Sequence, residues 1–406
     1  MTHPLSTTTG AATALPVIPA PRDPRCPLAP PREFTRWRET EGLQKAQWHG
    51  KEVWMISRYS DIRAALVDPR LSANTMAYGV ETSPDNEAPQ IFPRLDDPEH
   101  NRLRRMMTRD FTFRRAEAMR ASIQGYVDRF LDDMIASGPP ADLVRSFALP
   151  VPSLVICLLL GVPYEDHEFF QRHSTTGVDS KASESQRAES SLALFTYMFE
   201  LVARREREPG DDLMSRLVID HVTTGELSRE TAAMNGIILL AAGHETTASM
   251  ISLGTLALLQ NPSIFARLGQ TDDHAEIASI AEELMRYLTI VHSLVDRVAV
   301  EDLTIGGQLV RTGETVLMNL PAGNWDDAFV TDPAALDATR ATRGHLGFGY
   351  GVHQCIGANL ARVELQVALG TLARRLPTLS LAVPAEDLRF LNDKEIYGLD
   401  ELPLTW

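Results

Sequence analysis

One cysteine in this chain is placed where it could bind a metal. Cys355 lies near the end of a glycine-rich loop that begins at Phe348, and a helix is predicted over residues 356–375. The free N–H groups and the dipole at a helix N-terminus lower the pKa of a nearby thiol, and the thiolate is the form that binds metal. Gly349 and Gly351 would let the loop turn tightly against a flat neighbour. The pattern therefore predicts a thiolate ligand.

The other cysteines and the nearest histidine do not complete a zinc site. His353 is only two residues from Cys355, and neither Cys26 nor Cys157 has a Cys or His at zinc-ligand spacing. A single soft ligand indicates a metal that another group already holds, such as a haem porphyrin. The alternative is a buried structural cysteine.

Six positions of this loop resemble the haem-binding signature of the cytochrome P450 family: Phe348, Gly349, Gly351, His353, Cys355 and Gly357. Three further motifs of that family occur earlier in the chain, in the order in which the family has them. The resemblance implies a mainly α protein with small β-sheets, shaped as a triangular prism with a long central helix over the haem. It also implies haem b with Cys355 as its axial thiolate ligand.

Apolar periodicity and stop signals predict the elements that position these residues. The longest helix is predicted over residues 228–260 and would span about 50 Å. Asn261-Pro262 ends it, because proline pushes the preceding residue out of helical geometry. Further helices are predicted near residues 59–67, 98–109, 114–137, 147–161, 164–175, 187–207 and 276–289. Strands are predicted at Lys51–Ile56, within Leu303–Leu317 and in the last twenty-five residues.

The middle of the long helix carries Ala242-Gly243-His244-Glu245-Thr246-Thr247, a sequence that suits a helix poorly. Glycine costs about 1 kcal/mol relative to alanine in a helix interior, and adjacent threonines restrict side-chain rotation. Gly243 would leave space beside the backbone for a small ligand, and the Thr246 hydroxyl can bond back to the Ala242 carbonyl. His244 is expected to face outward. The alternative is a helix crossing that needs a small residue.

By resemblance, this segment is the oxygen-binding groove of the family. Activation of dioxygen consumes protons as well as electrons, so the site needs a route for protons. The resemblance implies that Thr246 holds bound oxygen by a hydrogen bond and that Glu245 relays protons from solvent. Glu245 and Thr246 are therefore the predicted catalytic pair.

Glu283 and Arg286 form a Glu-x-x-Arg motif on one helix face, which by itself is usually a surface ion pair of little value. Between the oxygen groove and the cysteine loop, it resembles the pair that anchors the segment behind the haem in the family. Arg340 matches the third member of that network. The role of all three would be structural. Trp325 departs from the pattern, since many relatives carry arginine at this position.

His100 and Arg104 share one face of a predicted helix that Asp97 would cap and Pro98 would begin. The propionates of haem are carboxylates that need cations in a desolvated site, and guanidinium pairs with carboxylate through two hydrogen bonds. By resemblance, four residues bind the propionates: His100, Arg104, Arg297 and His353. His345 lies near the same loop and ranks below these four.

The formal net charge is −15, from 39 basic and 54 acidic residues. This charge argues against non-specific nucleic-acid binding and for a soluble cytoplasmic protein. No membrane binding is expected, because the most apolar segment, Ser153–Val162, is too short to span a bilayer. Residues 100–120 reverse the sign with seven arginines, and in the family this helix borders the surface where the electron donor docks. The resemblance implies a ferredoxin, reduced by a ferredoxin reductase, as partner. The candidate docking residues are Arg102, Arg105 and Arg109.

The residues expected around the substrate are mostly apolar, which favours a bulky apolar molecule held by few hydrogen bonds. By resemblance they lie near residues 75–92 and 174–190 and include Ile238, Ala242, Val291, His292, Ser293 and Ile396. Residues 174–190, rich in Ser, Thr and charge, are expected to form a mobile connection between two helices. The resemblance implies that this connection is the lid over the substrate channel. The segment Phe147–Ser153 and the last ten residues resemble an actinobacterial branch that hydroxylates polyketides, macrolides, steroids and xenobiotics.

No linker or change in composition divides the chain beyond its first thirty residues. We expect an extended or disordered lead-in over residues 1–31, without the features of a signal peptide or an anchor, and one catalytic domain over residues 32–406. The prediction is a monomeric haem-thiolate monooxygenase. It would hydroxylate or epoxidise a natural product such as a polyketide, a macrolide or a steroid-like compound, with O2 and electrons from NAD(P)H.

Two alternatives keep the haem and change the chemistry. A nitric oxide reductase takes hydride directly from a nicotinamide, so it should lack the acid–alcohol pair and show a basic channel, whereas residues 72–93 contain no Lys or Arg. A non-catalytic haem-binding protein or sensor would have no use for a proton-delivery pair. The presence of Glu245 and Thr246 favours the monooxygenase over both.

Overall fold

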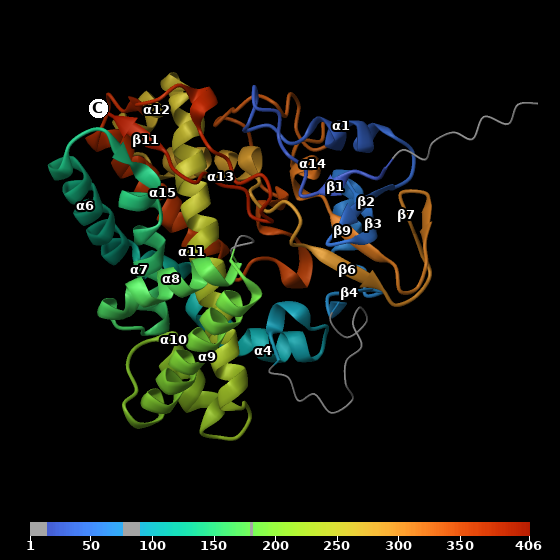
Figure 1. The fold of residues 1–406 in the computed structure, drawn as a ribbon, viewed down its shortest axis with the longest axis horizontal. Coiled ribbons are helices and arrows are strands. Elements are labelled where there is room, and N and C mark those ends of the chain that lie inside the picture. Colours follow the sequence, from blue (N-terminus) through green and yellow to red (C-terminus); the bar gives the residue numbers. More distant parts are fainter. Residues whose placement is uncertain (1–13, 76–89, 179–181) are drawn as a thin grey trace, which may run out of the picture.

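The structure is a computed structural model that describes residues 14–75, 90–178 and 182–406. Its longest element is helix α11, Arg229–Leu259, which runs through the helical part of the molecule (Figure 1). Ser228 caps this helix, because its hydroxyl accepts the Thr231 N–H at 3.1 Å. The helix has 31 residues and stops just before Pro262, which begins the next helix, as the sequence predicted.

The helices that pack most extensively against α11 are α7 (Pro150–Leu160), α9 (Glu184–Arg207) and α15 (Ala358–Arg375). Their apolar faces form the main core. Within the described residues α11 is the one helix long and apolar enough to cross a membrane, but 61% of that apolar window is buried inside the protein, as in a core helix. The remaining α-helices around it are α4 (Glu99–Thr108), α5 (Phe113–Ala118), α6 (Arg120–Ser137), α8 (His167–Val178), α10 (Leu213–Leu217), α12 (Pro262–Gln270) and α13 (His274–Leu288).

A six-stranded sheet lies to one side of the helices (Figure 1). Its strands follow the order β1 (Val17–Ile18), β2 (Gln44–Trp48), β3 (Lys51–Ile56), β9 (Thr315–Met318), β6 (Asp296–Ala299) and β4 (Leu71–Ser72). Helices α1 (Arg32–Glu39) and α2 (Tyr59–Ala65) both pack against α14 (Leu320–Asn324), which follows strand β9 in the chain. The two smaller sheets are β7 (Leu303–Ile305) with β8 (Gln308–Val310), and β10 (Ser380–Leu381) with β11 (Pro403–Thr405) and β5 (Ala141–Asp142).

The mainly α class with small sheets is confirmed, and several boundaries differ from the prediction. The helix predicted over 114–137 divides into α5 and α6 at Met119. Much of the predicted mobile connection at 174–190 is helical, because α8 continues to Val178 and α9 begins at Glu184. Ser183 and Gln186 form a capping box that begins α9. Residues 179–181 lie outside the described residues, as do most of residues 75–92.

The N-terminal segment contributes to the fold before residue 31, although the domain boundary placed there remains a prediction. Strand β1 pairs in parallel with β2. Arg22 is buried, and its guanidinium donates to the carbonyls of Leu28 and Leu288. The Tyr397 hydroxyl donates to the Pro27 carbonyl at 2.9 Å. Residues 14–31 are thus held against the C-terminal part of the chain by specific contacts.

Candidate active site

The loop around Cys355 has the tight turns that its glycines predicted. Gly349 and Gly351 have φ angles of +68° and +76°, which side chains rarely adopt. A Cβ at Gly351 would lie 2.8 Å from the Leu66 carbonyl oxygen, so a larger residue there would displace the loop. The Cys355 N–H donates to the Phe348 carbonyl at 2.9 Å and closes the loop on itself.

The predicted lowering of the Cys355 pKa is wrong for the protein alone. Protein atoms crowd round the thiol and raise its pKa by burial, while the Gly357 N–H and the charges of Arg104 and Arg362 act in the opposite direction. Yet Cys355 keeps an exposed surface. A thiol that is surrounded by protein atoms and still accessible to solvent indicates that Cys355 lies in a concave site. A metal in that site would deprotonate the thiol by coordination, which the helix N-terminus does not achieve alone.

Four basic side chains converge beside the cysteine loop, as predicted. Arg104 donates to the Gln354 carbonyl at 2.6 Å, and the His100 and His353 rings lie 4.0 Å apart. Burial, then the charges of Arg297, His100 and Arg104, lower the pKa of His353 to about 3. The buried His100 Nε2 has no hydrogen-bond partner. Two guanidinium cations, Arg104 and Arg297, and one unpartnered histidine nitrogen fit an anionic ligand.

Arg297 reaches this group from strand β6. It is almost fully buried, and its Nη1 donates to the Asp296 carbonyl at 2.7 Å. The Asp296 carboxylate is held by Arg94 at 2.5 Å, so this acid has its own cation. His345 does not join the group, because its Nε2 lies 3.0 Å from the Glu282 carboxylate. Its lower rank among the propionate candidates agrees with this contact.

The Asp97 cap is displaced by one residue from the prediction. Pro98 occupies the capping position of α4, after a cis peptide bond. The Asp97 carboxylate still accepts the Asn101 N–H in the first turn, at 3.2 Å. Asp97 therefore stabilises the helix N-terminus that carries His100 and Arg104 from outside the capping position.

On α11, the predicted back-bond of Thr246 is confirmed: its hydroxyl donates to the Ala242 carbonyl at 2.6 Å. Since the hydroxyl hydrogen is used there, the oxygen lone pairs remain free to accept a hydrogen bond. Ile238, Ala242 and Thr246 lie four residues apart, so they share one face of the helix. None of the three is buried, and Ala242 is exposed. This face is open to a ligand.

Two expectations about this helix are wrong. A Cβ at Gly243 would lie 3.0 Å from Ile156 of α7, so this glycine permits a close helix crossing and leaves no space for a ligand. His244 was expected to face outward, but it is buried with an unpartnered Nε2. Burial lowers its pKa to about 4, so the imidazole is neutral at pH 7. A helix surrounded by other helices offers few outward directions.

Glu245 points away from the Thr246 face, toward the C-terminal part of the chain. Its carboxylate forms an ion pair with Lys394, with Nζ and Oε1 3.7 Å apart. Both residues line a cavity of about 150 Å³, together with His244. Sequence reasoning did not find Lys394. The sequence sets Lys394 apart only because it is one of very few lysines in a chain whose basic residues are almost all arginine.

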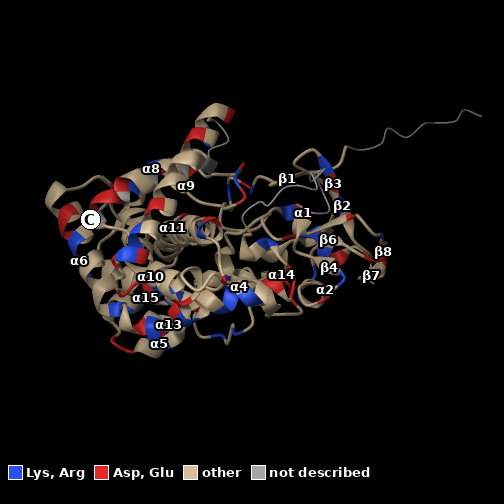
Figure 2. Ribbon diagram, turned by 90° about the horizontal axis from the view of Figure 1, so that it is seen from below, with Lys and Arg blue, Asp and Glu red and all other residues tan. Residues whose placement is uncertain are grey.

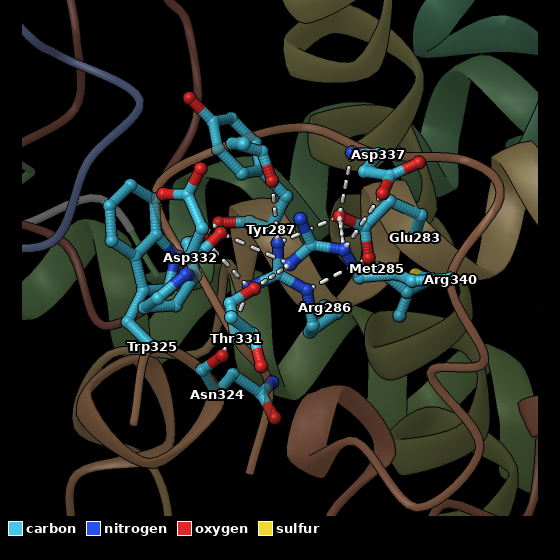
Figure 3. A network of polar contacts seen from close by, with 12 residues as sticks. Glu283, Met285, Arg286, Tyr287, Asn324, Trp325, Thr331, Asp332, Asp337 and Arg340 are labelled. Carbon is cyan, nitrogen blue, oxygen red and sulfur yellow. Dashed lines mark hydrogen bonds and ion pairs between the residues drawn. The ribbon is translucent and has the colours of Figure 1, made fainter. Parts of the chain in front are cut away.

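The Glu-x-x-Arg pair is a buried network (Figure 3). Glu283 and Arg286 are fully buried and joined by two hydrogen bonds of 2.8 Å. Glu283 also accepts the Asp337 N–H at 3.0 Å and lies 3.7 Å from Arg340. The remaining guanidinium hydrogens of Arg286 go to main-chain carbonyls, at Asn324, Pro333 and Ala335. The network ties α13 to the segment 324–340 that precedes the cysteine loop.

Trp325, the departure from the family pattern, has a defined contact. Its indole N–H donates to the Tyr287 carbonyl at 2.8 Å, just after Arg286 (Figure 3). The rings of Tyr287 and Trp325 are 5.2 Å apart. Trp325 therefore fastens the end of α13 to the same segment that Glu283 and Arg286 hold.

Both polar residues predicted to meet the substrate are buried, but His292 has a protein partner whereas the Ser293 hydroxyl has none. His292 is buried, accepts from Arg22 at 3.1 Å and stacks on Tyr397. Ser293 is fully buried. By contrast, Leu294 is 42% exposed and Ala242 is exposed. Val291 and Ile396 form a β-bridge and are half-buried. Among the residues predicted to line the pocket, those that keep an accessible surface are therefore apolar.

The basic residues of 100–120 divide into paired and open groups. Figure 2 shows basic residues along α4. Arg102 donates to the Glu226 carbonyl and to Gln90, and Arg115 and Arg120 face the acids Asp211 and Glu117. The open arginines are Arg105, Arg109 and Arg114, all exposed. Arg102 is thus less free for a partner than predicted, and Arg114 is an additional candidate.

Comparisons with known proteins agree with this geometry. The protein-family model "Cytochrome P450" matches residues 200–386 of this chain. Cytochrome P450 GfsF of Streptomyces halstedii is 45% identical over 399 residues, 96% of each chain. The chain belongs to the cytochrome P450 family. The vitamin D3 dihydroxylase of Streptomyces griseolus is 44% identical over 98% of this chain and 99% of its own.

Solved structures of the cytochrome P450 family have the same fold. The mycinamicin VIII C21 methyl hydroxylase MycCI from Micromonospora griseorubida, bound to mycinamicin VIII, has a TM-score of 0.88 at 37% identity and covers 97% of this chain and 100% of its own. The chain is thus a haem-thiolate monooxygenase, an oxidoreductase that incorporates one oxygen atom, and Cys355 is the ligand of the haem iron. The concave thiol site, and the basic group beside it with its unpartnered His100 Nε2, fit this cofactor.

Proposed function

We propose that this cytochrome P450 hydroxylates or epoxidises a bulky, largely apolar natural product, such as a polyketide, a macrolide or a steroid-like compound. The names of two relatives give vitamin D3 and mycinamicin VIII as the molecules that they act on or bind. In this chain, the open side chains near the oxygen groove are apolar, and His292 and Ser293 are buried. Such a site selects by shape and apolar area more than by hydrogen bonds.

The observation that carries this proposal is the Thr246 hydroxyl, which donates to Ala242 and keeps its lone pairs on the open face of α11. Haem, when bound, supplies the iron at which dioxygen is activated. We assign Thr246 the binding of that oxygen and Glu245 the transfer of protons to it. A nitric oxide reductase or a non-catalytic haem-binding protein would have no use for this pair.

The same proposal assigns the four basic residues to the haem propionates. Arg104 and Arg297 would supply the charge, while His100 and His353 would supply ring N–H donors. The unpaired His100 Nε2 supports this assignment, because a buried polar nitrogen without a partner is costly unless a ligand satisfies it.

Electrons would come from NAD(P)H through a ferredoxin reductase and a ferredoxin, with this enzyme acting as a monomer in the cytoplasm. An acidic ferredoxin complements the exposed Arg105, Arg109 and Arg114, which lie in a chain with an overall charge of −15. Long-range attraction of this kind raises association rates and weakens with salt.

A two-step experiment tests the function. First, purified holoenzyme is screened against apolar natural products for a change in haem spin state, which reports pocket occupancy. Each positive ligand is then incubated with NADH, ferredoxin reductase and ferredoxin, and product is quantified by mass spectrometry as a gain of one oxygen atom. Spin-state ligands that give no product and no oxygen consumption would overturn the proposal in favour of a haem sensor.

A further inference from the structure

A cavity of about 150 Å³ lies between α11 and a C-terminal hairpin over residues 389–400. Glu245 lines it from the helix and Lys394 from the hairpin, and the two form an ion pair. His244, Ser249 and Ser252 also line it. A cavity needs room and two to four polar partners to hold water, roughly 30 Å³ per molecule. This one has room for several waters and enough polar groups to bind them.

His244 points independently to a hydrated cavity. It is buried, its neutral imidazole leaves Nε2 without a partner, and it lines the same cavity. Buried polar atoms without a protein partner are commonly satisfied by ordered water. Glu245 is the next residue along the chain, so one segment of α11 places an unpaired nitrogen and the relay carboxylate at the same cavity.

The hairpin holds Lys394 in place through its backbone. Its two arms are joined by N–H···O bonds from Leu391 to Gly398 and from Asp400 to Arg389, each 3.0 Å. Near its tip, the His292 N–H donates to the Glu395 carbonyl at 2.8 Å. The hairpin also lies tightly against α11, because a Cβ at Gly398 would come within 2.7 Å of the Ser249 hydroxyl. The backbone of Lys394 therefore has a fixed position relative to α11.

We propose that this cavity is the route by which solvent protons reach Glu245, and that Lys394 is the positioning residue that holds the Glu245 carboxylate beside it. The ion pair is 3.7 Å long, too long for a direct hydrogen bond, so Lys394 orients the carboxylate without taking its lone pairs. A water in the cavity can then donate a proton to Glu245, and the Glu245 side chain must rotate toward the Thr246 face to pass the proton on. This inference rests on the proposed role of the acid–alcohol pair.

The test uses holoenzyme carrying Lys394→Gln, with Lys394→Arg as the conservative rescue. Lys45→Gln is the matched control, because it makes the same substitution at an exposed pair with Glu52, and neither residue lines the cavity. The solvent deuterium isotope effect on NADH oxidation and the product formed per NADH are measured with a spin-state ligand. We expect Lys394→Gln to enlarge the isotope effect and lower the product yield severalfold, Lys394→Arg to restore both, and Lys45→Gln to leave both unchanged.

A second readout needs no turnover. Folding equilibrium constants of the wild type, Lys394→Gln, Glu245→Gln and the double variant give a double-mutant cycle, with an expected coupling factor of about two to five. A coupling factor of one, or an unchanged isotope effect and product yield in Lys394→Gln, overturns the inference. If the wild type oxidises no ligand at all, the proposed function fails, and the coupling factor alone decides whether Lys394 positions Glu245.

Discussion

Removal of the Glu283 carboxylate should be among the most damaging single changes in this protein. Glu283→Ala deletes two 2.8 Å bonds to Arg286, the bond from the Asp337 N–H and the 3.7 Å ion pair with Arg340. Arg286 has no exposed surface, so its charge would stay buried with only main-chain carbonyls as acceptors.

The expected cost follows from that geometry. Breaking a buried ion pair by removing one partner costs about 3–5 kcal/mol, because an uncompensated charge is left behind. Whole domains are stable by only about 5–15 kcal/mol, so this loss is a large part of the total. The segment 324–340 would lose its attachment to α13, and the cysteine loop that follows it would be placed less accurately. We therefore expect Glu283→Ala to accumulate with little or no haem.

Two measurements and two comparison variants test this reasoning. The ratio of haem to protein absorbance gives cofactor content, and urea unfolding gives the free energy of unfolding. Glu283→Gln keeps the shape and loses the charge, so it should fall between alanine and wild type. Glu52→Ala removes a carboxylate from an exposed pair with Lys45 and should cost no more than about 1 kcal/mol. Glu283→Ala with full haem content and a loss below that of Glu52→Ala would refute the argument.

Three further predictions concern catalysis, electron transfer and acid stability. Thr246→Ala should keep haem and substrate binding but divert electrons to hydrogen peroxide; an unchanged product yield per NADH would contradict the role given to its hydroxyl. The double change Arg105→Glu and Arg109→Glu should raise the KM for ferredoxin about tenfold and flatten its salt dependence, while Arg145→Glu, at another exposed arginine, should not. Burial alone would raise the pKa of Glu282, but hydrogen bonds from Arg362 and His345 outweigh it and lower the pKa from 4.5 to about 2. Since the folded-state pKa is depressed, its stabilising contribution is complete above pH 4.5 and is lost as pH falls toward about 2. Unfolding free energies measured over that range should decline less in Glu282→Gln, and equal slopes in the two proteins would disprove the assignment.

Local geometry was predictable from the sequence where both residues of a contact lie in the same helix or loop. The Thr246–Ala242 bond follows from a spacing of four residues in a helix, and the end of α11 follows from Asn261-Pro262. The turns at Gly349 and Gly351 likewise depend only on the loop itself. Each of these features needs no knowledge of what packs against the segment.

Features that depend on packing partners could not be predicted in this way. His244 lies about 100° around the helix from Glu245, but that angle has meaning only when the neighbours of each face are known. His292 was predicted as a substrate contact, yet its partner Arg22 comes from a distant N-terminal segment. Lys394 meets Glu245 for the same kind of reason, since a hairpin far along the chain folds back onto α11.

The two adjacent glutamates of α13 show how one helix fixes the cysteine loop from both sides. Glu283 points into the core and holds Arg286, Arg340 and the segment that leads into the loop. Glu282, about 100° away around the helix, accepts two 2.7 Å bonds from Arg362 of α15, the helix that follows the loop. Arg362 in turn lies over the Phe348 ring at 4.5 Å, within the loop. Cys355 is therefore held between two chain segments that are both anchored on α13, and the Glu-x-x-Arg motif accounts for only one of these anchors.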